Sequence, residues 1–331
     1  MGRHSNGSCL KMSNADLLVK AMTYQNPETI PVSIGTLPAL WRKHPGEMKE
    51  ITARYPQFFG DISEQYNYDT YTPASYHEGS FADEWGCVWS NIQEGQESIV
   101  TGHPVKTRED IRSLKIPDDR TGRLPHGFMY LRLLDLRGFE EAMFDFADEA
   151  PELQILIDKV LEYNMIQVDV AIGKNSGPVQ YFGDDLGMQK GLAIGRDKWV
   201  KYMKPCFTKL YKKVHDAGKL VYMHTDGCIW EIMPDLKEAG VNMVNPQYRA
   251  NGLDNLVRVC KGKIPINLDL DRQFLPFATP SSIEDHVREC IEALYLPSGG
   301  LGISLELGQD VSPEIIEASL AALEKYRHYK G

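Results

Sequence analysis

A regular alternation of apolar runs and amphipathic stretches occupies the second half of the chain. Short apolar runs predict buried strands, whereas stretches in which apolar residues recur every three or four positions predict helices. Strands and helices that alternate in this way imply a parallel sheet. The predicted strands are Phe128–Leu133, Val179–Gly183, Lys219–His224, Asn242–Asn245, Pro265–Asp269 and Gly300–Leu305. The predicted helices are Lys198–Ala217, Ile229–Ala239, Leu253–Cys260, Ser281–Leu294 and Pro313–Tyr326.

The first half of the chain has a weaker pattern. It predicts a helix over Asn14–Tyr24, a short strand over Ile30–Ile34 and a helical stretch over Trp41–Phe59. Tyr66–Gln96 is long and irregular, and such segments are usually functional or form small strands of their own. Because the sequence shows no internal repeat and no linker, residues 1–331 are expected to form one domain, with residues 1–13 disordered.

Two architectures fit this order of elements, an open doubly wound sheet and a closed barrel. No G-x-G-x-x-G motif follows the first predicted strand, which weighs against the dinucleotide-binding form of the open sheet. With the weak N-terminal strands included, the strand count is about eight, as in a TIM barrel. The sequence therefore predicts an α/β fold, a (β/α)8 barrel with an N-terminal helical extension.

Composition and charge narrow the class of protein. Hydrophobic residues make up 42% of the 331 residues, enough to bury a large core. The net charge of −10 argues against a nucleic-acid partner, since phosphate binding needs a basic surface. No apolar run is long enough to span a membrane, and the polar first residues do not resemble a signal peptide. We therefore expect a cytoplasmic protein whose six scattered cysteines stay reduced.

Polar residues follow five successive predicted strands. In a barrel, the loops after the strands build the active site. A single Asp after a strand is ordinarily the N-cap of the next helix, but capping does not explain why five strands end alike. We infer a functional face made of Gly183-Asp184-Asp185, His224-Thr225-Asp226-Gly227, Asn245-Pro246-Gln247, Asn267-Leu268-Asp269-Leu270-Asp271 and Ser304-Leu305-Glu306.

His224 and Asp226 are the sharpest pair in this set. In an extended segment, residues i and i+2 point to the same side, so both side chains can face one metal ion, with Glu306 as a third ligand. An imidazole and two carboxylates suit Zn²⁺ with an open fourth position. The alternative is a histidine held by an aspartate without a metal, and Cys228 is a weaker ligand candidate.

The segment around Trp85 is aromatic. It can wall a pocket for a flat or apolar substrate, or it can form a small hydrophobic cluster beneath a loop. The sequence leaves both interpretations open.

Several segments resemble the uroporphyrinogen decarboxylase superfamily. They are Asn14–Ile34, Lys219–Pro246 with its His-x-Asp-Gly motif, Asn267–Pro280, and Gly299-Gly300 through Ile316. The resemblance implies a (β/α)8 barrel and one of two activities: decarboxylation of uroporphyrinogen without a cofactor, or zinc-dependent methyl transfer to or from corrinoid proteins. The decarboxylases resemble one another in an R-x-x-G-R-Y motif, whereas this chain has Ser33-Ile34-Gly35-Thr36-Leu37-Pro38 in that region. The resemblance therefore favours methyl transfer.

The methyltransferase branch holds zinc with an H-x-C motif and a distant cysteine. The corresponding positions resemble His224, Asp226 and Glu306, and the change from thiolate to carboxylate argues against thiol activation. Asp83–Trp89 and Phe182–Gly187 resemble the methyltransferases that use methoxylated aromatics or other small donors. The sequence has no D-x-H-x-x-G motif for cobalamin, so the resemblance implies a separate corrinoid protein that docks transiently over the barrel mouth.

The resulting hypothesis is a zinc-dependent methyltransferase whose cobalt acceptor belongs to its partner. A carboxyl group desolvated among other carboxylates has a raised pKa and can donate a proton near neutral pH. The alternatives are a cofactor-free decarboxylase of another carboxylated substrate and a barrel that only binds a small molecule. The expected residues are His224, Asp226 and Glu306 on zinc; Asp184, Asp185 and Asp269 in catalysis; and Trp85, Tyr181, Asn267 and Gln273 on the substrate.

Overall fold

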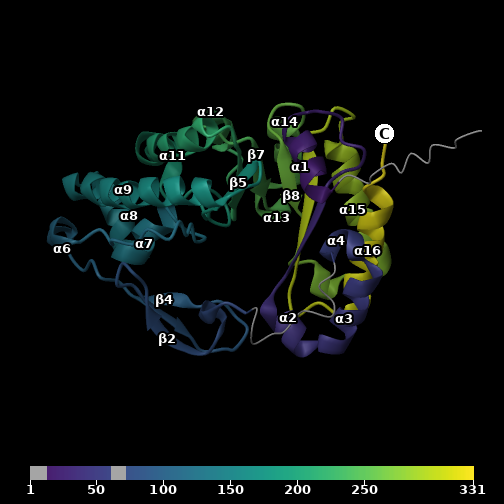
Figure 1. Ribbon diagram of the computed structural model, residues 1–331, viewed down its shortest axis with the longest axis horizontal. Coiled ribbons are helices and arrows are strands. Elements are labelled where there is room, and N and C mark those ends of the chain that lie inside the picture. Colours follow the sequence, from purple (N-terminus) through teal and green to yellow (C-terminus); the bar gives the residue numbers. More distant parts are fainter. Residues whose placement is uncertain (1–12, 61–71) are drawn as a thin grey trace, which may run out of the picture.

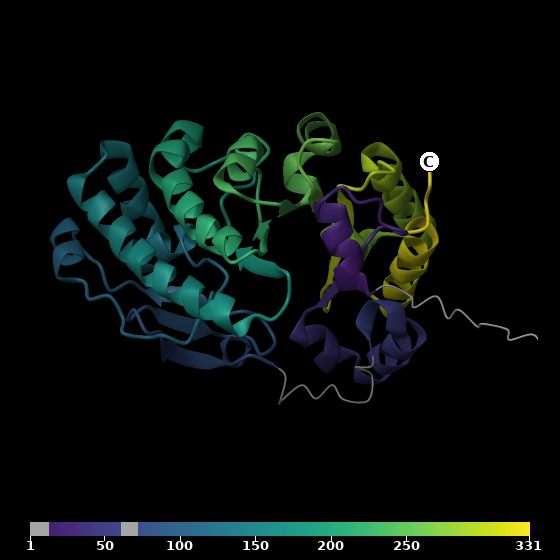
Figure 2. The ribbon, with the colours of Figure 1, turned by 45° about the horizontal axis from the view of Figure 1, so that its top comes forward.

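A curled parallel sheet organises the computed structural model, which describes residues 13–60 and 72–331. Six parallel strands pair in the order β1-β9-β8-β7-β6-β5. The curl of the sheet and the helices that follow one another around its outside are seen in Figures 1 and 2. The strands are β1 (Val32–Thr36), β5 (Val179–Gly183), β6 (Leu220–Thr225), β7 (Met243–Pro246), β8 (Ile266–Asp269) and β9 (Leu301–Leu307).

The predicted α/β fold with a parallel sheet is confirmed, but the closed barrel of eight strands is not seen among the described residues. Strands β1 and β5 form the two edges of the sheet and do not pair with each other. The reason lies in the chain between them, which lacks the alternation of apolar runs and amphipathic stretches. That part of the chain forms helices and a small antiparallel sheet instead.

The small sheet has three strands in the order β2-β3-β4. They are β2 (Gly79–Ala82), β3 (Val88–Asn91) and β4 (Ile99–Gly102). The first two fall within Tyr66–Gln96, where the sequence allowed small strands, although residues 66–71 lie outside the described part of the chain. Every residue of β2 is exposed, so the segment has no buried face to produce a strand pattern in the sequence.

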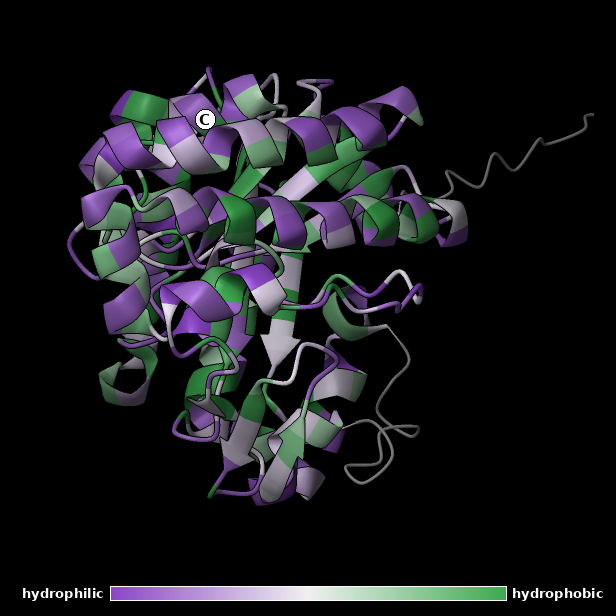
Figure 3. Ribbon diagram, turned by 90° about the vertical axis from the view of Figure 1, so that its left-hand side faces the viewer, coloured by the Kyte–Doolittle hydropathy of each residue, from purple (hydrophilic) through white to green (hydrophobic). Residues whose placement is uncertain are grey.

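Helices cover the convex face of the large sheet, except α1 (Asn14–Met22), whose Ala21 and Met22 cluster with Tyr222 and Met243 on the concave side. Hydrophilic and hydrophobic segments alternate along the outer helices in Figure 3. Their hydrophobic sides pack on outward-facing strand residues such as Met223, Leu268 and Ile303, all fully buried in the main core cluster. The helices are α1 (Asn14–Met22), α2 (Pro38–Lys43), α3 (Pro45–Arg54), α4 (Pro56–Phe59), α6 (Arg108–Ser113), α7 (Tyr130–Arg137), α8 (Phe139–Asp148), α9 (Pro151–Lys174), α10 (Gly195–Lys198), α11 (Lys204–Asp216), α12 (Met233–Ala239), α13 (Tyr248–Asn251), α14 (Leu253–Cys260), α15 (Pro280–Leu294) and α16 (Pro313–Tyr326).

Helix ends match their local sequence signals. The side chain of Ser312 accepts a hydrogen bond from the backbone N–H of Ile315, and Pro313 occupies the first turn of α16. The predicted bounds of α14 and α16 are confirmed. The predicted helix Lys198–Ala217 is interrupted by a π-helical turn at Trp199–Met203 between α10 and α11.

The predicted strand Phe128–Leu133 is wrong, because this segment leads into helix α7. A short apolar run does not distinguish a buried strand from a buried helix. Here the carboxylate of Asp184 accepts hydrogen bonds from the backbone N–H groups of Met129, Tyr130 and Leu131. A tertiary contact therefore satisfies the free N–H groups at the start of the helix.

Two further expectations concern disorder and membrane-spanning segments. The predicted disorder of residues 1–13 falls almost wholly on residues 1–12, which lie outside the described residues, whereas Ser13 caps α1. Within the described residues, none of the helices has both the length and the apolar character needed to cross a membrane.

Candidate metal and substrate site

The concave face of the large sheet is polar toward the carboxyl ends of its strands, whereas Val179, Tyr222 and Met243 form a small apolar cluster nearer the other end. Successive side chains along one strand point to opposite faces of the sheet, so His224 shares a face with Tyr222, while Met223 packs in the core on the other. In the sheet register, His224 lies beside Asn245 and Glu306 beside Gly35. The interior of a TIM barrel is ordinarily filled by bulky branched side chains. The concave face of this sheet instead carries hydrogen-bonding groups.

A cavity of about 710 Å³ lies at the carboxyl ends of these strands. Its volume is within the range of small-molecule sites. The segment between η1 (Ala74–Tyr76) and β4 contributes one wall, and the strand ends contribute the other. The lining residues are Leu37, Tyr76, Gly95, Gln96, Glu97, His126, Asp185, His224, Asp226, Arg272, Gln273, Glu306, Gly308, Gln309 and Asp310.

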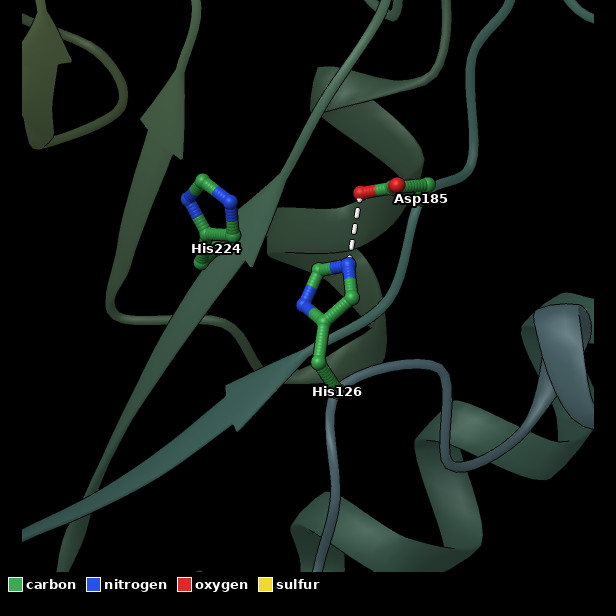
Figure 4. A group of neighbouring side chains, drawn as sticks. All are labelled: His126, Asp185 and His224. Atoms are coloured by element: carbon green, nitrogen blue, oxygen red, sulfur yellow. Dashed lines mark hydrogen bonds and ion pairs between the residues drawn. The ribbon is translucent and has the colours of Figure 1, made fainter. Parts of the chain in front are cut away.

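Three side chains in this cavity form a group that can hold a metal ion. One potential ligand atom from each of His126, Asp185 and His224 lies within 4.8 Å of the other two. His126 Nε2 lies 2.9 Å from Asp185 Oδ1, and the two imidazole centroids are 5.5 Å apart. Figure 4 shows the His126–Asp185 contact, with His224 on the neighbouring strand. The group joins the ends of β5 and β6 to the segment before α7.

Backbone geometry fixes His126 beside β5. The N–H of Gly127 donates to the carbonyl of Gly183 over 2.9 Å, and Gly127 has a φ of +75°, which favours glycine. A Cβ atom on Gly183 would lie only 2.7 Å from His126 Nδ1. Glycine at position 183 therefore leaves the space that the imidazole occupies.

Asn245 determines which nitrogen of His224 is free. The side-chain NH₂ of Asn245 donates to the carbonyl oxygen of Asn267, so its Oδ1 faces His224 Nδ1 at 2.8 Å. An acceptor at that position places the proton on Nδ1 and leaves Nε2 to face the cavity. A histidine held in this way by an outer hydrogen bond is typical of metal sites.

Acidic and basic side chains inside the cavity stabilise one another's charged forms. Burial opposes the charged form of His126, but the hydrogen bond to Asp185 and nearby carboxylates outweigh it and raise its pKa to about 9. Burial also opposes the charged form of His224, yet its contacts with Asp226 raise its pKa. For Asp226, burial is outweighed by His224 and Arg272, which lower the carboxyl pKa.

Arg272 lies between two of the predicted metal ligands. Its guanidinium donates to Asp226 Oδ2 over 2.8 Å and also pairs with Glu306. The other oxygen of Asp226, Oδ1, lies 3.3 Å from His224 Nε2. This buried oxygen accepts no regular hydrogen bond from the described residues. A cation placed near His224 would complete its coordination.

Two imidazole nitrogens and a carboxylate oxygen suit a divalent metal ion of the first transition row, and the free oxygen of Asp226 lies next to them. Of the three ligands predicted from the sequence, the metal-capable group contains only His224. The other two, Asp226 and Glu306, line the same cavity and are joined by Arg272.

The three carboxylates predicted for catalysis occupy different surroundings. Asp185 lines the cavity, whereas Asp184 is fully buried at the N-terminus of α7. Asp269 is 4% exposed; burial raises its pKa to about 7 against the opposing charges of Arg272 and His224. Asp269 can therefore hold a proton near neutral pH.

The four residues predicted to contact the substrate lie in three different places. Gln273 lines the main cavity. Tyr181 and Asn267 line a second cavity on the concave side of the sheet. Trp85 is 5% exposed, and its ring packs edge-on against Tyr163 at a centroid distance of 5.2 Å. Trp85 thus belongs to the core, which was one of the two interpretations that the sequence allowed.

Among the histidines and charged residues of the main cavity, sequence reasoning missed Glu97, His126, Arg272 and Asp310. Burial and the neighbouring carboxylates Asp185 and Glu306 raise the pKa of Glu97. Arg272 offered one signal, as a cation between the predicted residues Asp269 and Gln273. His126 offered none, because it precedes a helix and ends no strand.

The comparisons with known proteins agree with this fold. A methyltransferase from Methanosarcina mazei has a similar structure, with a TM-score of 0.64 and 14% sequence identity. The match covers 96% of this chain and 99% of that chain, and at this identity it shows the fold alone. None of the curated protein sequences matches the chain. The family model for uroporphyrinogen decarboxylase (URO-D) matches residues 135–329, more than half of the chain. The chain therefore belongs to the uroporphyrinogen decarboxylase (URO-D) family.

Proposed function

We propose that this protein is a zinc-dependent methyltransferase. It would move a methyl group from a small donor, a methoxylated aromatic compound, to the cobalt of a corrinoid bound by a separate protein. The observation that carries the proposal is the convergence of His126, Asp185 and His224 in a cavity at the carboxyl ends of the strands. The similar fold of a methyltransferase from Methanosarcina mazei supports the reaction class.

We assign the zinc ligands to His126, Asp185 and His224. Their donor atoms converge, whereas Asp226 and Glu306 are already joined by the guanidinium of Arg272. The set predicted from the sequence, His224 with Asp226 and Glu306, is the alternative. Bound zinc would supply Lewis acidity toward the oxygen of the donor, where negative charge develops as the methyl group leaves.

Other residues of the chain have supporting roles in this proposal. Asn245 keeps Nε2 of His224 directed at the cavity. Asp269 retains a proton near neutral pH because it is buried. It does not line the main cavity, so we assign it as the source of a proton that would reach the departing oxygen through one water molecule. Gln273 lines the cavity and would orient the donor. The sequence contains no D-x-H-x-x-G motif, so the corrinoid is assigned to a partner that docks over the cavity.

Metal analysis distinguishes the two ligand sets. The His126→Ala and Glu306→Gln variants would be purified beside the wild type, loaded with zinc, dialysed and measured by mass spectrometry. Each variant removes one residue that belongs to only one of the two sets. We expect stoichiometric zinc in Glu306→Gln and loss of zinc in His126→Ala. The reverse pattern would restore the set predicted from the sequence.

Turnover tests the reaction class. The zinc-loaded protein would be incubated with a reduced corrinoid protein and a panel of methoxyaromatics, methylamines and methanol. We expect a change in the corrinoid absorbance together with release of the demethylated product for methoxyaromatics, and neither change in His224→Ala. Carbon dioxide release without metal or corrinoid would instead identify a decarboxylase. Ligand binding without turnover across the panel would favour a protein that only binds a small molecule.

A further inference from the structure

A second cavity, of about 320 Å³, lies between α1, β1 and the β5–β6 edge of the large sheet. It is separate from the main cavity, and the two share no lining residue. None of its lining residues is charged, whereas five carboxylates line the main cavity. The walls of this second cavity therefore suit an uncharged molecule, because they offer no partner to an ion.

Two hydroxyl groups in the second cavity have hydrogens to donate. The side-chain NH₂ of Asn267 donates to Tyr222 Oη over 2.7 Å and to Ser33 Oγ over 3.1 Å. Both hydroxyls are acceptors in these contacts, and no hydrogen bond within the described residues uses either as a donor. A phenol hydroxyl is a hydrogen-bond donor as well as an acceptor, so Tyr222 Oη still has its hydrogen to offer. A ligand with an acceptor oxygen would satisfy these donors.

The other walls are aromatic and aliphatic. The ring of Tyr181 lies 5.1 Å from that of Tyr222, tilted by 51°, and Tyr181 is 52% exposed on the open edge strand β5. Leu18 and Val32 contribute aliphatic surface on the opposite side. A cavity of roughly 150 Å³ holds benzene, so this one can admit a ring with a substituent. Aromatic side chains favour such a ring through offset or edge contacts.

We propose that this second cavity is a binding site for an uncharged, single-ring aromatic molecule with an acceptor oxygen. The ring contacts Tyr181, Leu18 and Val32, and the oxygen accepts a hydrogen bond from the Tyr222 hydroxyl. The site does not depend on the proposed methyl transfer, because none of its lining residues belongs to the metal-capable group.

An isosteric pair of ligands tests the proposal. Methoxybenzene has the acceptor oxygen, and ethylbenzene has nearly the same size with a methylene in its place. Their dissociation constants would be measured by ligand-observed NMR titration of the full chain. We expect methoxybenzene to bind about five- to tenfold more tightly, the usual effect of one hydrogen bond. In Tyr222→Phe the difference should fall below about twofold, while ethylbenzene binding is unchanged.

Two matched variants locate the binding site. Leu18→Trp fills the second cavity, and Gln309→Trp puts the same bulk into the main cavity. The zinc-free protein is used for this comparison, because its main cavity lacks the ion proposed to contact an ether oxygen. Binding of methoxybenzene should be lost in Leu18→Trp and kept in Gln309→Trp, with folding checked by circular dichroism. The opposite pattern, or no saturable binding to the wild type, would overturn the proposal. If Leu18→Trp does not fold, the Tyr222→Phe comparison decides alone.

Discussion

Replacing Asn245 by leucine should weaken metal binding without removing any ligand. The side chain is 5% exposed and makes two hydrogen bonds, one to His224 Nδ1 and one to the carbonyl of Asn267. Leucine has a similar volume but no acceptor, so the imidazole loses both its orientation and its fixed tautomer. Loss of such an outer hydrogen bond typically costs 10–100-fold in metal affinity. That range corresponds to about 1.4–2.7 kcal/mol of binding free energy.

The same substitution should also destabilise the fold, and an aspartate variant separates the two effects. Asn245→Leu leaves the carbonyl of Asn267 without its donor, at a cost of about 1–3 kcal/mol in the free energy of unfolding. Asn245→Asp loses the same donor and should be destabilised at least as much, because its carboxylate faces that carbonyl oxygen. It retains the acceptor for His224, however, and a carboxylate behind a histidine raises the basicity of the ligand.

The assay is competition for zinc with a chromophoric chelator at neutral pH, beside urea unfolding of the metal-free proteins. The expected order of zinc affinity is Asn245→Asp at or above the wild type, with Asn245→Leu 10–100-fold below it. The expected order of stability places both variants below the wild type. If zinc affinity merely followed stability in both variants, Asn245 would have a packing role only and the tautomer argument would be refuted.

Three further outcomes are expected. Because the pKa of His126 is raised to about 9, its protonated form stabilises the folded, metal-free protein. This contribution is complete below pH 6.5 and is lost as the pH rises to about 9. In His126→Ala, the free energy of unfolding measured in urea should therefore change less with pH over this range. Gly183→Ala should displace His126 and weaken zinc binding at least tenfold in the chelator assay while circular dichroism stays unchanged, because the new Cβ would lie 2.7 Å from His126 Nδ1. Asp184→Ala should cost about 2–4 kcal/mol of unfolding free energy, since three backbone N–H groups lose their acceptor, yet its zinc stoichiometry should equal that of the wild type.

The late strands could be predicted from the sequence because each is a short apolar run between well-marked helices. The predicted strand Val179–Gly183 agrees with β5 at both ends, and β6 and β9 differ from their predictions by one or two residues. In the first half of the chain, fewer elements could be predicted. Strand β2 is exposed throughout, so burial left no pattern in it, and the apolar run Phe128–Leu133 has the same composition in a strand or in a helix.

The site was partly predictable for a geometric reason. The carboxyl ends of parallel strands meet at one edge of a sheet, so polar residues that end different strands gather without any knowledge of their contacts. This argument brought together Asp185, His224, Asp226 and Glu306, which all line the main cavity. It does not distinguish Asp184 from Asp185, since the side chains of adjacent residues point in opposite directions and only tertiary contacts show which one caps a helix.

His126 lies beyond what this argument can reach. It ends no strand, and its position depends on one backbone hydrogen bond between Gly127 and Gly183, two residues far apart in the sequence. It also precedes the part of the chain that the family model matches, residues 135–329. If His126 binds the metal ion together with Asp185 and His224, the ion links the first half of the chain to the β/α units of the second half.

Arg272 neutralises part of the negative charge in the main cavity. Without it, Asp185, Asp226 and Glu306 would compete for any cation that enters, and no single position among them would be preferred. The guanidinium pairs with Asp226 and Glu306, which leaves Asp185 as the carboxylate beside the two imidazoles. A divalent ion at that group then meets nitrogen and oxygen donors rather than thiolates. Such a set is harder than one built on cysteine, so it retains more Lewis acidity toward an oxygen atom. For the proposed reaction, a ligand set of two imidazoles and the carboxylate of Asp185 therefore favours an ether over a thiol as the group that zinc contacts.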